Sequence, residues 1–274
     1  MKNRIQSKLR SENGVSLLEA LLALFLAGIV TVAIFKVYVN QHKNWSIQEQ
    51  VTDMQQNARA AIDELTRQIR MAGHKIPIQL DGIQAYNTNP DTIIISYASS
   101  GCRAPIEHKM PTPSSELRCD GHDISCFYEG QWVYIFHPDS GGGDFFEITE
   151  VQVAASHIQH NKTILSRSYD KNAIVLALEQ VKYYIDYSDT LHPNLMMKLP
   201  GRSPEVYAEN IEDLQFQYRM KNGVTVDVPA IPEDIREVII SLTARTAIPD
   251  PDFPDDPYRR RTFASSVNLR NLDI

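Results

Sequence analysis

The chain has 274 residues, of which 43% are hydrophobic and 22% are charged, a composition that suits one membrane helix and one folded domain of ordinary size. Its formal net charge is −7. An acidic chain is a poor general binder of nucleic acid or of an anionic membrane, although it leaves room for a local basic patch.

The first predicted element is an almost unbroken apolar run from Val15 to Phe35. At ~1.5 Å per helical residue this run is roughly 31 Å long, which is enough to cross the apolar core of a bilayer. Four Lys or Arg residues and a single Glu lie ahead of it. This surplus of positive charge predicts a cytoplasmic N-terminus and an exported remainder.

Glu19 interrupts the apolar run. A carboxylate inside a membrane helix costs about 2.5–3.5 kcal/mol on insertion scales, so it needs a partner. A cleaved secretory signal has a shorter apolar core, of about 7–15 residues, and a small-residue cleavage site after it, neither of which is present here. A plain signal anchor, which only tethers an outer domain, leaves Glu19 unexplained.

The order of a basic leader, Gly14, one residue, Ser16-Leu17-Leu18-Glu19 and an apolar helix resembles the prepilin segment of type IV pilins and their relatives. This resemblance implies that a peptidase in the membrane cuts between Gly14 and Val15 and methylates the new amino group of Val15. It also implies that Glu19 lies near the free N-terminus of a neighbouring subunit in the assembled fibre. Val15 departs from the phenylalanine that usually follows the glycine in this family.

After Phe35 the helical pattern continues over residues 37–73. Apolar residues recur at the three- and four-residue spacing of an amphipathic helix, at Val51, Met54, Ala58, Ile62, Leu65 and Ile69. Gly73 and Pro77 supply the stop. The competing interpretation is two helices with a break within residues 40–46.

From residue 80 onward, short runs rich in β-branched and aromatic residues predict strands. These strands cover residues 92–97, 131–136, 145–153, 174–187, 211–220, 235–246 and 263–269. Residues 99–122 are expected to be irregular, and Asn222-Gly223 predicts a tight hairpin turn. Consecutive strands joined by short turns predict an α+β fold in which the helix packs on one face of an antiparallel sheet.

Three segments near the end of the chain, residues 208–218, 235–242 and 267–271, look like the C-terminal half of PilW-type minor pilins. Their layout is also similar to that of the J-type pseudopilins of type II secretion. Together with the N-terminal segment, this resemblance implies a pilin-like fold in four parts. They are a leader peptide (1–14), a transmembrane and assembly helix (15–36), its amphipathic continuation (37–73) and an extracytoplasmic β-rich domain (74–274).

Three cysteines, Cys102, Cys119 and Cys126, lie in the middle of the chain. An exported domain meets oxidising conditions, which favours a disulfide. The preferred pair is Cys119–Cys126, which closes a short loop and leaves Cys102 over; Cys102 with either partner is the alternative. A zinc site that adds His108 and His122 is disfavoured because no Cys-x-x-Cys is present, so we expect no metal and no cofactor.

The sequence predicts a structural protein, not an enzyme, because it carries no nucleophile elbow and no metalloprotease pattern. Arg259–Arg261 is its one basic cluster, and we expect it to pair with the acidic loop at residues 249–257. The resemblance implies a minor pilin that is held in the bacterial inner membrane with its N-terminus in the cytoplasm. Its expected partners are the prepilin peptidase and the other minor and major pilins, and its expected destination is the pilus at the cell surface.

Three alternatives compete with this interpretation. A J-type pseudopilin shares the same assembly chemistry. A pilus-tip adhesin or DNA-uptake module would bind its ligand through residues 80–205, where an exposed aromatic or basic patch would favour it, although nucleic acid is not an expected partner for so acidic a chain. An enzyme tethered by a signal anchor is the third alternative.

Overall fold

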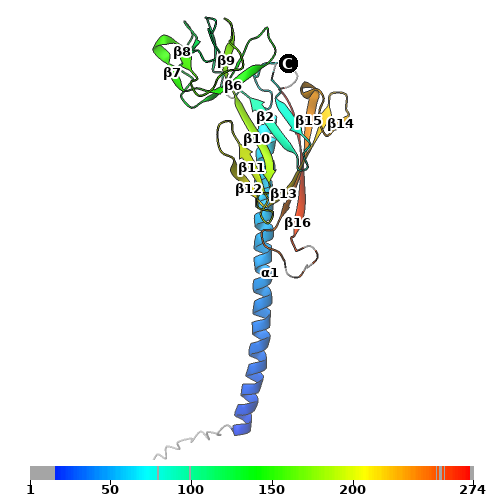
Figure 1. Cartoon of the computed structure of the whole chain (residues 1–274). Coiled ribbons are helices and arrows are strands. Elements are labelled where there is room, and N and C mark those ends of the chain that lie inside the picture. Colours follow the sequence, from blue (N-terminus) through cyan, green and yellow to red (C-terminus); the bar gives the residue numbers. More distant parts are fainter. Residues whose placement is uncertain are drawn as a thin grey trace, which may run out of the picture. The chain divides into compact units, whose positions relative to one another are not determined.

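The computed structural model describes residues 16–271, apart from residues 79, 99, 251, 253, 254 and 256, so the predicted leader at residues 1–14 lies outside the described residues. The chain divides into two units, Met1–Glu49 and Gln50–Ile274. Helix α1, Leu17–Met71, contributes to both (Figure 1). It is helical throughout residues 40–46, so the competing interpretation with a break there is wrong.

In the second unit, one face of α1 is buried. Four of the predicted apolar positions, Met54, Ala58, Leu65 and Ile69, are buried in the core, whereas the predicted Val51 and Ile62 are only partly buried against it. Ala61, which was not predicted, is also buried. The helix ends at the predicted stop. Gly73 has φ +79°, a conformation that is cheap only for glycine, and its N–H donates a hydrogen bond to the carbonyl of Ser96 at 3.0 Å.

Two antiparallel sheets pack with this part of α1 around one hydrophobic core, and we call the assembly the helix lobe. The first sheet has the order β1-β2-β10-β11-β12, with bounds Ile83–Tyr86, Thr92–Tyr97, Glu179–Asp186, Asn194–Lys198 and Glu205–Glu209. The second has the order β14-β13-β15-β16, with bounds Thr225–Val226, Ile211–Met220, Ile235–Arg245 and Arg260–Asn268. The 3-10 helix η2, Pro232–Asp234, leads into β15.

Residues 102–177 form a second structure with its own core, the middle lobe. One sheet has the order β3-β9-β5-β6, with bounds Arg103–Pro105, Ile174–Ala177, Trp132–Phe136 and Gly143–Glu147. The other has the order β4-β8-β7, with bounds Leu117–Arg118, His157–Gln159 and Glu150–Gln152, and the 3-10 helix η1, Val153–Ala155, joins β7 to β8.

The predicted α+β layout, a long helix with antiparallel strands, is confirmed. The described strands form four sheets where one was predicted, and two strand assignments are wrong. The predicted strand 174–187 is two strands, β9 and β10, which separate at Leu178 and enter different sheets. The predicted strand 145–153 is also divided, because the N–H of Ile148 donates to Gln131 and the N–H of Thr149 donates to Gln159. Residues 99–122, expected to be irregular, contain β3 and β4.

Other local predictions are confirmed. Strands β2 and β13 have the predicted bounds. At the Asn222-Gly223 turn, the N–H of Met220 donates to the carbonyl of Val224 at 2.8 Å, and Gly223 has φ +82°. Lys221, Asn222 and Gly223 form a three-residue connection, in which Gly223 takes the positive φ at no steric cost and Asn222 does not adopt one.

One carboxylate lies in the core of the helix lobe. Glu64 of α1 is 6% exposed and accepts hydrogen bonds from Tyr183 at 2.8 Å, Gln68 at 2.9 Å and Arg67 Nε at 3.0 Å. Burial opposes the ionisation of Glu64, but the bonds from Gln68, Arg67 and Tyr183 outweigh it and lower its pKa. The ionised carboxylate of Glu64 therefore links α1 to strand β10 through the hydrogen bond from Tyr183.

Candidate assembly site

Ser16 caps the N-terminus of α1. Its Oγ accepts a hydrogen bond from the backbone N–H of Glu19 at 3.2 Å, and its carbonyl accepts one from the N–H of Ala20 at 3.0 Å. Serine is among the best N-cap residues, because its side chain satisfies an N–H that has no partner within the helix. The Ser-x-x-Glu spacing is also that of a capping box, so Glu19 has a local reason to follow Ser16 by three residues.

The carboxylate of Glu19 lies in the first turn of α1, between exposed leucines. Leu18 is 78% exposed and Leu22 is 58% exposed. Glu19 forms no ion pair with any described residue, and the next cation along the helix is Lys36, about 25 Å away at the helical rise. The helix N-terminus favours a negative charge by a few tenths of a kcal/mol, far less than insertion into lipid costs.

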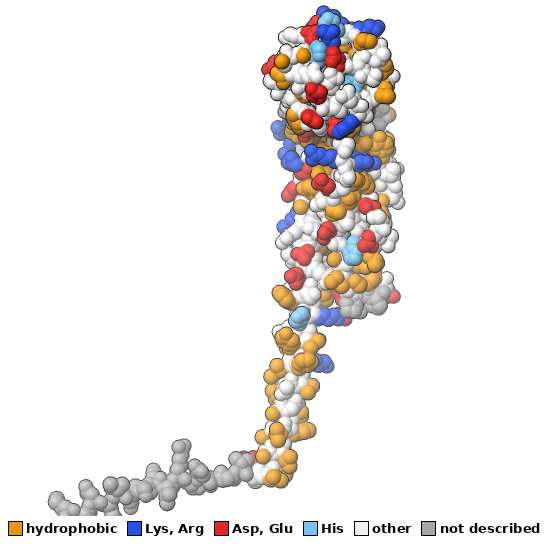
Figure 2. Space-filling model, turned by 60° about the vertical axis from the view of Figure 1, so that its left-hand side comes forward, with side chains coloured by type: hydrophobic (Ala, Val, Ile, Leu, Met, Phe, Trp, Pro, Cys, Tyr) orange, Lys and Arg blue, Asp and Glu red, His pale blue; other side chains and the backbone are white. Residues whose placement is uncertain are grey.

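The large apolar side chains of the first unit are exposed, and Figure 2 shows those on one face of the helix. By length and composition this helix is able to cross a membrane, as its predicted role requires. Its exposed large side chains are Leu17, Leu18, Leu21, Leu22, Leu24, Phe25, Leu26, Ile29, Val30, Val32, Ile34, Phe35, Val37, Tyr38 and Val39. The hydroxyl of Thr31 donates to the carbonyl of Ala27 at 2.8 Å, which satisfies it inside an apolar segment.

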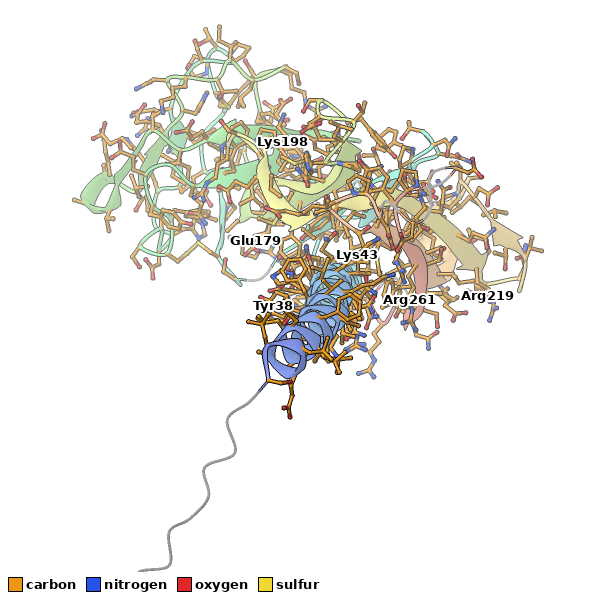
Figure 3. The ribbon with its side chains drawn as sticks, turned by 90° about the horizontal axis from the view of Figure 1, so that it is seen from below. Tyr38, Lys43, Glu179, Lys198, Arg219 and Arg261 are labelled. Atoms are coloured by element: carbon orange, nitrogen blue, oxygen red, sulfur yellow. A yellow bond between two sulfur atoms is a disulfide. The ribbon has the colours of Figure 1, made fainter. Side chains whose placement is uncertain are left out.

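An aromatic stripe follows the apolar segment on one face of the helix. The ring centroids of Tyr38 and His42 are 6.2 Å apart, and those of His42 and Trp45 are also 6.2 Å apart. Tyr38, labelled on α1 in Figure 3, is 62% exposed and Trp45 is 64% exposed. Aromatic residues with polar atoms concentrate at the membrane–water interface, so the stripe lies where a spanning helix would leave the bilayer.

The predicted cleavage and methylation residues, Gly14 and Val15, lie outside the described residues. Of the predicted assembly residues, the structure describes Glu19. Two features of this helix, the cap by Ser16 and the aromatic stripe, were not predicted from the sequence. The capping-box spacing and the four- and three-residue intervals between Tyr38, His42 and Trp45 were the signals that indicate them.

The predicted disulfide Cys119–Cys126 is wrong. Cys102 and Cys126 form the disulfide, with Cα atoms 5.9 Å apart, and Cys119 is free. Cys119 directly follows β4, and its N–H donates to the carbonyl of Ser156 at 2.8 Å, which fixes it within the core of the middle lobe. Burial raises the pKa of the Cys119 thiol to about 12, so it is no reactive thiolate.

Most of the residues considered for a zinc site are engaged in other interactions. The disulfide uses two of the cysteines, His108 lies 3.0 Å from a carboxylate oxygen of Asp120, and His122 lies 3.0 Å from one of Glu107. Within the part of the chain that the structure describes, no three His, Cys, Asp or Glu side chains converge in a way that would hold a metal ion.

The basic cluster Arg259–Arg261 is engaged within the fold. Arg259 donates two hydrogen bonds to Asp250, at 3.0 and 2.8 Å, which confirms the expected pairing with the acidic loop. Arg260 binds Glu212 with two hydrogen bonds, and Arg261 lies over the ring of Phe263 at 5.4 Å. These cations hold strand β16 and its loop in place.

The fold places this chain among proteins that combine an exposed, apolar N-terminal helix with a β-rich unit. The β-rich unit packs on the continuation of that helix. No family model, no curated protein and no solved structure matches the chain.

Proposed function

We propose that this chain is a minor pilin of the PilW kind, which assembles through its N-terminal helix. The observation that carries the proposal is Glu19, a carboxylate in the first turn of an exposed apolar helix that forms no ion pair with any residue the structure describes. Its partner is the N-terminal amino group of a neighbouring subunit, freed by cleavage between Gly14 and Val15. The new terminus lies four residues before Glu19, or about 6 Å along a helix, so neighbouring subunits bring the two charges together with a small axial shift.

The charge pair supplies a driving force and a fixed axial register for assembly, which the apolar surface alone does not. Helices that leave lipid for a bundle of like helices exchange one apolar environment for another, so burial alone gives little drive and no fixed register. Two unit charges 4 Å apart attract by about 4 kcal/mol at an effective dielectric constant of 20, and only one axial register brings them that close. Glu19 therefore sets the register of the subunit in the fibre or in its priming complex.

The same chemistry serves a pseudopilus of type II secretion. The two assignments differ in the filament that contains the subunit. A pilus subunit co-purifies with sheared pili and its loss reduces piliation, with adhesion and twitching motility as the expected consequences. A J-type subunit co-purifies with secretion pseudopilins, and its loss blocks secretion.

Mass spectrometry of the mature N-terminus tests the processing. We expect a chain that begins with N-methylated Val15. An intact Met1 in the assembled protein would contradict the proposal.

Replacement of Glu19 by Gln tests the assembly step. Because Gln keeps the shape and removes the charge, we expect at least a tenfold loss of the subunit from sheared filaments, with an unchanged amount in the membrane. Glu49→Gln, which removes an exposed carboxylate from the same helix, is the matched control and should assemble normally. Normal incorporation of the Glu19→Gln subunit would refute the role of the charge.

A further inference from the structure

Two lysines lie directly opposite each other on one face of the five-stranded sheet. Lys182 of β10 and Lys198 of β11 are cross-strand partners, and like charges at such positions destabilise a sheet. Within the described chain, neither lysine forms an ion pair with a carboxylate. The ammonium group of Lys182 lies 5.1 Å from the ring centroid of Tyr184, two residues further on the same face. The two ammonium groups are therefore free of carboxylates within the described chain and are available to an anionic partner.

A cavity of about 220 Å³ is lined by sequence neighbours of the two lysines, although neither lysine lines it. Its lining includes Gln180, two residues before Lys182 on the same strand face, and Leu199, which directly follows Lys198. Trp132 and Tyr128 supply aromatic walls, and Tyr128 is 63% exposed.

The loop after Lys198 brings in a third cation. Arg202 lines the cavity and, like the lysine pair, forms no ion pair among the described residues. Before it, Gly201 has φ +66° and lies so close to Trp132 that a Cβ there would be 2.2 Å from the indole Nε1. Because Gly201 has no Cβ, the loop is able to pack against the indole ring of Trp132, beside the cavity.

The face of the second unit that is turned forward in Figure 2 carries side chains of both charges. Figure 2 shows Lys and Arg side chains gathered in a band on the face turned forward. Figure 3 labels Lys198 and also Glu179, the one carboxylate in the lining of the cavity. Glu179 accepts a hydrogen bond from the hydroxyl of Tyr97, so its charge is partly engaged within the fold.

We infer that this face binds single-stranded nucleic acid, with phosphates on Lys182, Lys198 and Arg202 and one unpaired base in the cavity beside Trp132 and Tyr128. Base stacking on aromatic side chains combined with cations along the backbone is the general mode of single-strand binding. A duplex offers phosphates but no free base for the cavity, and an anionic polysaccharide offers charge but no flat aromatic ring. The inference goes beyond assembly and does not depend on it.

The small number of cations predicts weak, salt-sensitive binding. Single strands release counterions with a slope of about −0.7 per neutralised phosphate, so three contacts give a slope of roughly −2 in a plot of log affinity against log salt concentration. The net negative charge of the chain is compatible with this, because the phosphates bind a local patch.

The test uses the full-length chain in non-ionic detergent micelles and a fluorescent oligothymidine probe, with anisotropy measured over a range of salt concentrations. We expect binding with a slope of about −2, reduced to about −0.7 in the double variant Lys182→Gln/Lys198→Gln. Tyr128→Ala should lower the affinity about tenfold and leave the slope unchanged, because it removes stacking and no charge. Lys221→Gln, in the Asn-Gly turn of the other sheet, is the control and should bind like the parent chain.

Three outcomes would overturn the inference. They are no binding at low salt, binding that the double variant does not weaken, and tighter binding of duplex DNA or heparin than of the single strand. Thermal melting separates loss of the site from loss of the fold. Because the double variant removes a like-charge contact, its melting temperature should equal or exceed that of the parent chain.

Discussion

At the scale of single residues, the hydrogen bond between Tyr183 and Glu64 is the contact most open to test. Tyr183→Phe removes a donor at 2.8 Å from a buried carboxylate and changes little else. Since a hydrogen bond to a charged group contributes about 1.5–3 kcal/mol, we expect the free energy of unfolding to fall by about 2 kcal/mol at pH 7. Denaturant titration of the full chain in detergent, followed by circular dichroism, measures this.

The effect should depend on pH with a definite sign. The pKa of Glu64 in the folded chain is lowered from the model-compound value of 4.5, so its stabilising contribution is present above pH 4.5 and is lost as the pH falls through the folded value. The difference in free energy of unfolding between Tyr183→Phe and the parent chain should therefore shrink as the pH falls below the ordinary pKa of a glutamate. Tyr86→Phe, at a 45% exposed tyrosine, is the control; equal losses for both variants at pH 7 would refute the argument.

At the scale of elements, α1 carries two different surfaces in one helix, and a pair of identical substitutions distinguishes them. Leu65 is 0% exposed in the core of the helix lobe, whereas Leu21 is 58% exposed in the first unit. Leu65→Ala should lower the stability of the second unit by about 2–5 kcal/mol, because it leaves a cavity. Leu21→Ala should leave that stability unchanged. Tryptophan fluorescence during denaturation measures both, and similar losses would contradict the assignment of the core face.

Periodicity predicted these elements where local signals are strong and failed where pairing is long-range. The apolar spacing predicted α1 correctly, and the apolar alternation predicted β13 correctly. Each element buries one face, so its apolar residues recur with the period of a helix or of a strand. The division of residues 174–187 at Leu178 was missed because no Gly, Pro or other turn residue marks it. A continuous apolar run over residues 174–178 gives way there to the alternation that begins at Val181, while the partner strand changes from β5 to β2. Strands β1, β11 and β12 were missed because they are short and partly polar.

Among the functional residues, too, those with a local sequence signal were predicted and those that depend on long-range pairing were not. Glu19 was found because a charge in an apolar run contradicts its surroundings. The lysine pair was not found, because Lys182 and Lys198 are unremarkable in sequence and become neighbours only through the register of β10 and β11. The disulfide was mispaired because nearness in sequence says little about which Cα atoms approach within bridging distance.

At the scale of the whole second unit, the helix lobe and the middle lobe have separate cores, and the disulfide belongs to the middle lobe. Cys102 and Cys126 are 24 residues apart, so in the chain-entropy account their link contributes about 3 kcal/mol by restricting the unfolded chain. The double variant Cys102→Ser/Cys126→Ser should therefore unfold its middle lobe at lower temperature, while the transition of the helix lobe moves little. Differential scanning calorimetry in detergent would then resolve two transitions.

The control for the disulfide variant is Cys119→Ala, which keeps the disulfide and removes a buried thiol. It should cost about 1 kcal/mol through lost packing and leave no free thiol, whereas the parent chain titrates one thiol under denaturing, non-reducing conditions. Joint unfolding of both lobes at the same lowered temperature in Cys102→Ser/Cys126→Ser would show that the cores are one cooperative unit. A free thiol that remained in Cys119→Ala would show that Cys102 and Cys126 are not paired. Either result would remove the basis for treating the middle lobe as a separately stabilised part of the chain.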